Sequence, residues 1–154
     1  MLFRTHIVFA VFIYLLLSPF LPEKIIFGLF FLIATLFVDI DSRKSKIGKK
    51  WFFRPLQWCT KHRGMFHSLF FALMLSVSIF FLNKDAGIGF LFGYILHLWL
   101  DCFTLSGVKL FWPAFDFKFK GRVRSGGIVE EVLFVLVLLF DIFLIARLFF
   151  KPLF

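Results

Sequence analysis

Five long blocks of apolar residues constrain this chain more than any other feature of its sequence. The chain has 154 residues, of which 61% are hydrophobic and 22% aromatic, and its mean hydropathy is +0.95. A soluble domain keeps close to half its residues apolar and about a quarter charged. These blocks are too long and too free of charge for a water-facing surface. The composition therefore predicts an integral membrane protein with no room for a separate soluble domain.

The apolar blocks are continuous, which favours helices over the alternating segments of about ten residues that a membrane barrel needs. We predict an all-α, polytopic membrane helix bundle with about five transmembrane helices, in which residues 1–154 form a single integral membrane domain. The first block resembles a signal peptide, but no small-x-small cleavage pattern follows it, so we expect it to be retained. The predicted spans cover residues 7–21, 24–38, 65–82, 87–105 and 128–149.

The basic residues gather on one predicted face of the membrane. Five crossings place 14 of the 18 Lys and Arg on the face that carries the amino terminus. An excess of Lys and Arg in short loops marks the cytoplasmic side. We therefore predict a cytoplasmic amino terminus.

The segment 42–64 mixes Lys and Arg with aromatic residues such as Trp51 and Trp58. Aromatic rings favour headgroup depth and basic side chains favour anionic lipid, so this pattern is typical of an interfacial segment that contacts anionic headgroups. An ordinary basic cytoplasmic loop is compatible with the same residues. Nucleic-acid binding uses similar patterns, but we do not expect it from so short a loop held at the membrane by both ends.

Nearly every residue that could bind a metal falls at an end of one of the apolar blocks. Because each crossing reverses direction, all of these ends return to the same membrane face, and the predicted metal site therefore lies at the cytoplasmic surface. The candidate ligands are His6, Asp39, Asp41, His62, His67, His97, Asp101 and Glu130.

His97 and Asp101 form an HxxxD motif, whose four-residue spacing puts both side chains on one helical face. A buried His–Asp hydrogen bond that only holds helices together is the alternative, but ionisable residues inside a membrane segment are costly and usually functional. His62 and His67 flank a junction between a loop and a helix, where both can point to one centre. Each alone could be a surface histidine.

Asp39 and Asp41 would be about 200° apart on a continuing helix. One can bind metal while the other orients a ligand or accepts a proton; charges at a solvated helix end are the alternative. Glu130 lies in the first turn of a predicted helix, where a capping role competes with ligation, and Glu131 is an equally plausible ligand by chemistry. Asp39, Asp41 and Glu130 are the candidate catalytic carboxylates.

Mixed histidine and carboxylate ligands suit Zn²⁺, with Mn²⁺ or Fe²⁺ as alternatives, and the candidates suffice for one or two ions. Such ions polarise phosphoryl oxygens and activate water. Nearby cations attract a phosphate-bearing substrate, and the candidates for that contact are Arg63, Arg122 and Arg124. The residues therefore predict a metal-dependent hydrolase of an anionic, lipid-like substrate.

The order of these motifs resembles the YdjM-like family of predicted metal-dependent hydrolases of prokaryotic inner membranes. The shared elements are an early His6, the run Asp39-Ile40-Asp41-Ser42, His62-Arg63-Gly64 before His67-Ser68, Gly93-Tyr94 before His97, Asp101, Thr104 and Gly107, then Trp112-Pro113, and Gly127 before Glu130. The resemblance spans nearly the whole chain. It implies a multi-pass inner-membrane protein whose site contains the eight candidate ligands.

A more distant similarity is to the zinc-dependent phospholipase C superfamily of all-helical phosphoesterases. That superfamily ends its motif series with HxxxE, whereas the position four before Glu130 is Gly126. Asp41 or His67 then substitutes for the missing ligand, or fewer ions bind.

Three other functions compete with the hydrolase. A metal-independent lipid-phosphate phosphatase also has an HxxxD motif, but its expected Ser-Arg before that motif and its Pro-Ser-Gly-His are absent from the sequence. A transporter would place its ligands near the bilayer midplane, often between repeats. A structural or regulatory protein would use metal only to clamp the helices together.

Overall fold

The computed structural model describes residues 1–41, 51 and 65–150, and of Asp41 only the backbone. Within these residues the fold is all-α, with two isolated backbone bridges and no strand. The helices are α1 (Phe3–Leu17), η1 (Ser18–Phe20), α2 (Lys24–Phe37), η2 (Val38–Asp41), η4 (Met65–His67), α4 (Leu69–Phe80), α5 (Lys84–Cys102) and α6 (Ile128–Phe149).

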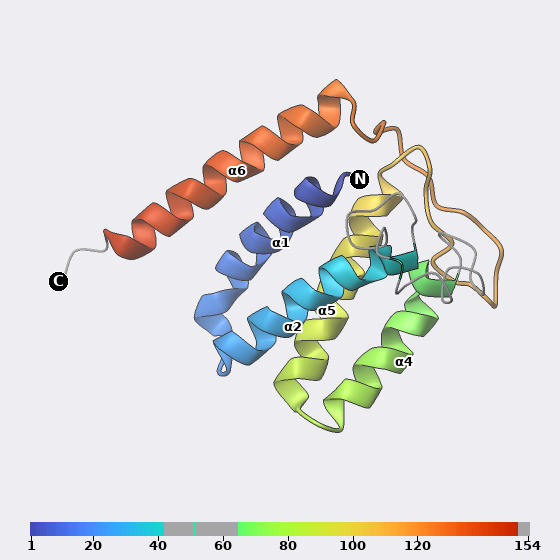
Figure 1. Cartoon of the computed structure of the whole chain (residues 1–154), viewed down its shortest axis with the longest axis horizontal. Coiled ribbons are helices and arrows are strands. Elements are labelled where there is room, and N and C mark those ends of the chain that lie inside the picture. The colour runs from blue at the N-terminus through green and yellow to red at the C-terminus, as the bar shows by residue number, and fades with distance from the viewer. Residues whose placement is uncertain (42–50, 52–64, 151–154) are drawn as a thin grey trace.

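Helix α5 is the centre of the bundle because α2, α4 and α1 all pack against it (Figure 1). Two glycines allow α2 to approach it closely. A methyl group added at Gly89 would lie 2.5 Å from the carbonyl oxygen of Phe27, and one at Gly93 would overlap the carbonyl of Phe31. Small residues spaced by four let membrane helices pack backbone against backbone. This contact brings the end of α2 against the end of α5.

Capping residues set where α4 and α5 begin. The side chain of Asn83 accepts a hydrogen bond from the backbone N–H of Ala86 at the start of α5, and Ser68 accepts one from Phe71 at the start of α4. Asn and Ser are favoured N-cap residues because their oxygens satisfy otherwise unpaired helical donors. The two helices therefore form a hairpin whose open end carries both η4 and the end of α5.

Helix α6 lies at the outside of the bundle and packs against α1 (Figure 1). The two helices start side by side, because the backbone N–H of Leu2 donates a hydrogen bond to Glu130. Arg4 forms an ion pair with Glu131 and stacks over the ring of Phe134, at 4.9 Å from its centroid. These contacts fix the first turns of both helices to each other.

Among the described residues, two helical segments rather than the five expected are long and apolar enough to cross a membrane alone, namely Phe3–Phe20 and Ile128–Phe149. Helices α2 and α4 have 14 and 12 residues, so each extends only about 21 Å or less against about 30 Å of hydrocarbon. Helix α5 has 19 residues, but its polar members, including Lys84, Asp85 and Asp101, reduce its hydropathy. These charged residues near both ends of α5 distinguish it from a continuously apolar span.

The expected helical blocks are otherwise found at nearly the expected positions. Helix α6 matches residues 128–149, and α2 ends one residue before 38. The block expected at 65–82 is divided, because η4 precedes α4 and the Ser68 cap separates them. The predicted interfacial segment 42–64 lies outside the described residues except for Trp51, which is exposed.

We predict that Gly93→Ala destabilises the bundle, because the added methyl group meets the Phe31 carbonyl and forces α2 away from α5. Overpacking of this kind costs about 1–3 kcal/mol. The measurement is the thermal midpoint of the purified protein in detergent, with Ile95→Ala on the exposed side of the same helix as control. An unchanged midpoint in Gly93→Ala would show that the two helices do not need this close approach.

Candidate metal centre

His97 and Asp101 lie one turn apart on α5 and are both buried. They continue the line of Gly89 and Gly93, so all four residues recur at intervals of four and share one face of the helix. The glycines bring α2 against this face, and the two polar residues follow where α2 ends. The HxxxD motif therefore lies on α5 just beyond its close contact with α2.

Three further candidate ligands reach these two from other helix ends. His6 comes from the first turns of α1, Asp39 from η2 after α2, and His67 from η4 before α4. Asp101 lies among the three imidazoles: its Oδ1 is 3.5 Å from Nε2 of His6, and its Oδ2 is 3.8 Å from Nε2 of His67 and 3.9 Å from Nε2 of His97. Asp39 Oδ1 lies 3.8 Å from Nε2 of His97. Four helix ends thus converge on one cluster, as the sequence predicted.

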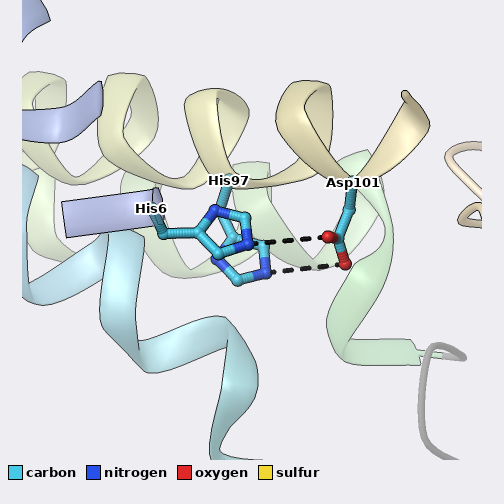
Figure 2. Close-up of side chains that lie close together, drawn as sticks. All are labelled: His6, His97 and Asp101. Atoms are coloured by element: carbon cyan, nitrogen blue, oxygen red, sulfur yellow. Dashed lines mark ion pairs between the residues drawn. The ribbon is translucent and has the colours of Figure 1, made fainter. Parts of the chain in front are cut away.

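The rings of His6 and His97 are stacked, with centroids 4.1 Å apart and planes inclined by 5°. Figure 2 shows that both rings direct a nitrogen toward the carboxylate of Asp101. The His67 ring meets the His97 ring edge-on, with centroids 5.5 Å apart. The three imidazoles are therefore packed together with almost no exposure to solvent.

A backbone hydrogen bond sets the tautomer of His97. Its Nδ1 lies 2.7 Å from the carbonyl oxygen of Thr35 on α2, and because a carbonyl only accepts, Nδ1 must carry the proton. The lone pair of Nε2 then faces the two carboxylates. Histidines that bind metals almost always donate their other N–H in this way, which fixes the ring and raises its basicity.

The described residues suit a metal ion in spacing and in chemistry. Nε2 of His97 and both ring nitrogens of His6 are buried without a hydrogen-bond partner among the described residues, an arrangement that is costly unless something binds them. Separations of 3.5–3.9 Å are too long for hydrogen bonds. They approach the spacing of about 3.3–3.6 Å between two ligands of one tetrahedral zinc ion.

The ligand atoms form two overlapping groups that share His97. One contains His6, His97 and Asp101, and the other contains Asp39, His67 and His97. Within each group the ligand atoms lie within 4.8 Å of one another. Asp101 also pairs with the α-amino group of Met1, which gives this buried carboxylate a positive partner.

Two contacts that the sequence analysis did not predict hold the cluster in place. Thr35 supplies the carbonyl that orients His97, and its own hydroxyl lies within hydrogen-bond distance of the carbonyl oxygens of Phe31 and Gly93. Tyr94 is fully buried and donates a hydrogen bond to the carbonyl of Phe66, beside His67. In the sequence, the four-residue spacing of Gly89, Gly93 and His97 was the pattern from which the contact between His97 and α2 could have been predicted.

The end of α5 is closed by Thr104 and Gly107. The Thr104 hydroxyl donates to the carbonyl of Asp101, and Gly107 adopts φ +60° while its N–H donates to that hydroxyl. The N–H of Gly121 donates to the Thr104 carbonyl, which ties the segment between α5 and α6 to the site. Arg122 and Arg124 follow in this segment and are exposed.

Glu130 lies outside the two ligand groups and contacts backbone instead. Its Oε1 accepts the N–H of Leu2 at 2.5 Å, and its Oε2 accepts the N–H of Gly126 at 2.7 Å. The carboxylate thus holds the first turn of α1, from which His6 projects. Its role as a metal ligand stays a prediction, as do the roles of His62, Arg63 and the Asp41 side chain, which lie outside the described residues.

We expect Glu130→Gln and Glu130→Ala to differ. Gln keeps an oxygen that can accept one backbone N–H, whereas Ala leaves both N–H donors without an acceptor. Each buried donor left unpaired lowers the free energy of unfolding by about 1–3 kcal/mol. Zinc binding to the metal-free protein, measured by titration calorimetry, should weaken more in Glu130→Ala than in Glu130→Gln. Glu23→Gln, at an exposed carboxylate just before α2, is the control. Equal and complete loss of binding in both Glu130 variants would instead identify a direct ligand.

Comparison with known proteins identifies the family of this chain. The model of the YdjM inner membrane protein family matches residues 1–151. The chain is 36% identical to the inner membrane protein YdjM of Escherichia coli (strain K12) over 91 residues, covering 53% of this chain and 46% of that protein. It is 33% identical over 86 residues to the uncharacterized protein YvsG of Bacillus subtilis (strain 168), covering 53% of this chain and 54% of that protein.

The chain therefore spans about half the length of these curated relatives. No solved structure matches it. Because the family model covers almost the whole chain, the chain belongs to the YdjM family of inner membrane proteins.

Proposed function

We propose that this protein is a membrane-bound, metal-dependent hydrolase that acts on a phosphoester of a lipid or another anionic membrane-associated substrate. The observation that carries the proposal is the convergence of three imidazoles and two carboxylates from four helix ends, with the tautomer of His97 set by Thr35. Helix packing alone does not account for the buried His6 and His97 ring nitrogens that lack a hydrogen-bond partner among the described residues. The distant similarity to zinc-dependent phospholipase C enzymes suggests the reaction class.

His6, His67, His97 and Asp101 would hold the metal, because a ring nitrogen of each histidine lies 3.5–3.9 Å from the Asp101 carboxylate and all four side chains are almost wholly buried. A bound Zn²⁺ supplies Lewis acidity and lowers the pKa of a bound water toward about 7. Mn²⁺ and Fe²⁺ are the other ions that this donor set accepts.

Asp39 is the best candidate for orienting water or accepting a proton. Its side chain is 17% exposed, whereas that of Asp101 is 2% exposed, so water can reach Asp39 more readily. Asp39 also remains within 3.8 Å of His97. A positioned carboxylate acting as general base contributes about 10²–10⁴-fold to a reaction rate.

Arg122 and Arg124 would bind the substrate phosphate from the segment that Thr104 ties to the end of α5, and Arg63 is a further candidate. Guanidinium groups suit this role because their planar donors match phosphate oxygens. Anionic headgroups are the expected neighbours of so basic a surface. A lipid phosphoester is therefore the substrate class that fits both the site and its position at helix ends.

The same proposal places α2, α4 and α5 within the bilayer beside the two long spans, with the amino terminus and the site cytoplasmic. Large apolar side chains are exposed on the outer faces of α2 and α4, among them Ile25, Leu29, Phe70, Leu73 and Val77. Lipid would cover these faces at no cost, whereas water would not. The orientation follows from the predicted excess of Lys and Arg on the site's face.

The experiment measures product release by the detergent-purified protein: a headgroup or phosphorylated headgroup from a panel of phospholipids, and inorganic phosphate from prenyl phosphates. We expect release to stop with a chelator and to return with Zn²⁺ or Mn²⁺, and Asp39→Asn to lower kcat by about 10²–10⁴-fold. Asp116→Asn, at an exposed carboxylate paired with Lys109, should retain full activity. Turnover that is insensitive to chelators would favour a metal-independent phosphatase, and no turnover by metal-loaded protein would favour a structural role.

A further inference from the structure

A groove lies between the ends of α1 and α6 that are farthest from the metal-binding cluster. It has a volume of about 220 Å³ and is lined by Leu15, Leu16, Pro19, Leu144, Arg147 and Leu148. Five of the six lining residues are apolar, and the sixth carries the positive charge. The groove is therefore apolar apart from the Arg147 side chain.

The groove lies at the opposite ends of the two candidate spans from the cluster. Along α1, Pro19 follows His6 by 13 residues, or about 20 Å, and along α6 Arg147 follows Glu130 by 17 residues, or about 26 Å. Both helices are the two candidate spans, and Pro19 and Arg147 lie near the ends of those spans. Arg147 is thus expected at headgroup depth, with the leucines toward the hydrocarbon.

We propose that this groove binds an anionic glycerophospholipid, with one acyl chain along the leucines and the headgroup phosphate on the Arg147 guanidinium. A guanidinium beside a phosphate forms charge-assisted hydrogen bonds, and the exposed apolar walls of the groove match an acyl chain. This site is independent of the proposed hydrolase activity.

A second ionisable residue on α6 indicates where along the groove the headgroup can bind. Asp141 lies six residues before Arg147, about 9 Å nearer the middle of the helix, and is buried with its Oδ1 lacking a hydrogen-bond partner among the described residues. Leu144 and Leu148 follow it on the same face, at three and seven residues. The Asp141 carboxyl group offers a phosphate no positive partner, whereas Arg147 does, so the headgroup belongs at the outer end of the groove.

Arg147 has a simpler alternative role, since a cation in the last turn of a helix is favourable in any lipid. That role predicts no preference among phospholipids. A bound lipid with a single negative charge, such as phosphatidylglycerol, should instead be preferred over phosphatidylcholine, whose ammonium group neutralises its phosphate.

The test is native mass spectrometry of the full chain released from detergent after incubation with phosphatidylglycerol or phosphatidylcholine. We expect one phosphatidylglycerol per chain, at least tenfold more occupied than phosphatidylcholine. Arg147→Gln should remove this preference, Arg147→Lys should keep part of it, and Leu144→Trp should block both lipids by filling the groove. Lys84→Gln is the matched control, because Lys84 is an exposed cation at the start of α5, outside the groove.

Equal binding of the two lipids, or unchanged phosphatidylglycerol binding in Arg147→Gln, would overturn the proposal. A dimer mass without lipid would overturn it as well, because a second copy would then occupy the groove. Zinc binding by Arg147→Gln serves as a folding check, since the candidate metal centre lies at the other ends of these helices. Failure of the hydrolase assay would leave the expected lipid preference unchanged.

Discussion

The burial of the Asp101 carboxylate in an apolar helix bundle is the constraint on which the rest of this structure depends. An isolated buried carboxylate is too costly to persist, so it must have positive or hydrogen-bonding partners. The protein supplies a positive partner in the Met1 amino group, and it surrounds the carboxylate with His6, His67 and His97, whose ring nitrogens a bound metal ion would join to it. The helix ends that carry these residues must therefore lie close together.

The close contact between α2 and α5 makes this meeting possible. Gly89 and Gly93 let the backbones approach, and the approach puts the Thr35 carbonyl within 2.7 Å of Nδ1 of His97. The hydrogen bond turns the other nitrogen of the ring toward the carboxylates. The close packing of α2 on α5 and the tautomer of His97 thus both follow from the same glycine spacing. A substitution that separates the two helices should therefore also alter the orientation of the His97 ring.

Much of this arrangement could be predicted from the sequence because alternating crossings place helix ends on one face. The positions of His6, Asp39, His67, His97 and Asp101 followed from that rule, and α6 was predicted at its observed bounds. Only two of the five predicted spans are complete among the described residues, because continuous hydropathy does not show where a cap such as Ser68 shortens a helix. Thr35 was missed because its role rests on a backbone carbonyl, which every residue carries.

Glu130 shows a different limit of sequence reasoning. A carboxylate in the first turn of a helix suits both metal binding and hydrogen bonding to free backbone donors. Only the placement of α1 beside α6 shows that the donors include Leu2 on another helix. The choice between the two roles depends on contacts between residues 128 positions apart, which no local pattern encodes.

The most direct test of this account is the metal content of the detergent-purified protein, measured by elemental analysis beside a His97→Ala, Asp101→Ala double variant. Cys102→Ala is the control, because Cys102 neighbours Asp101 but lies outside both ligand groups. The account predicts about one or two zinc or manganese ions per chain, retained in the control and lost in the double variant. A folded protein that contains no metal, and takes up none on reconstitution, would contradict it.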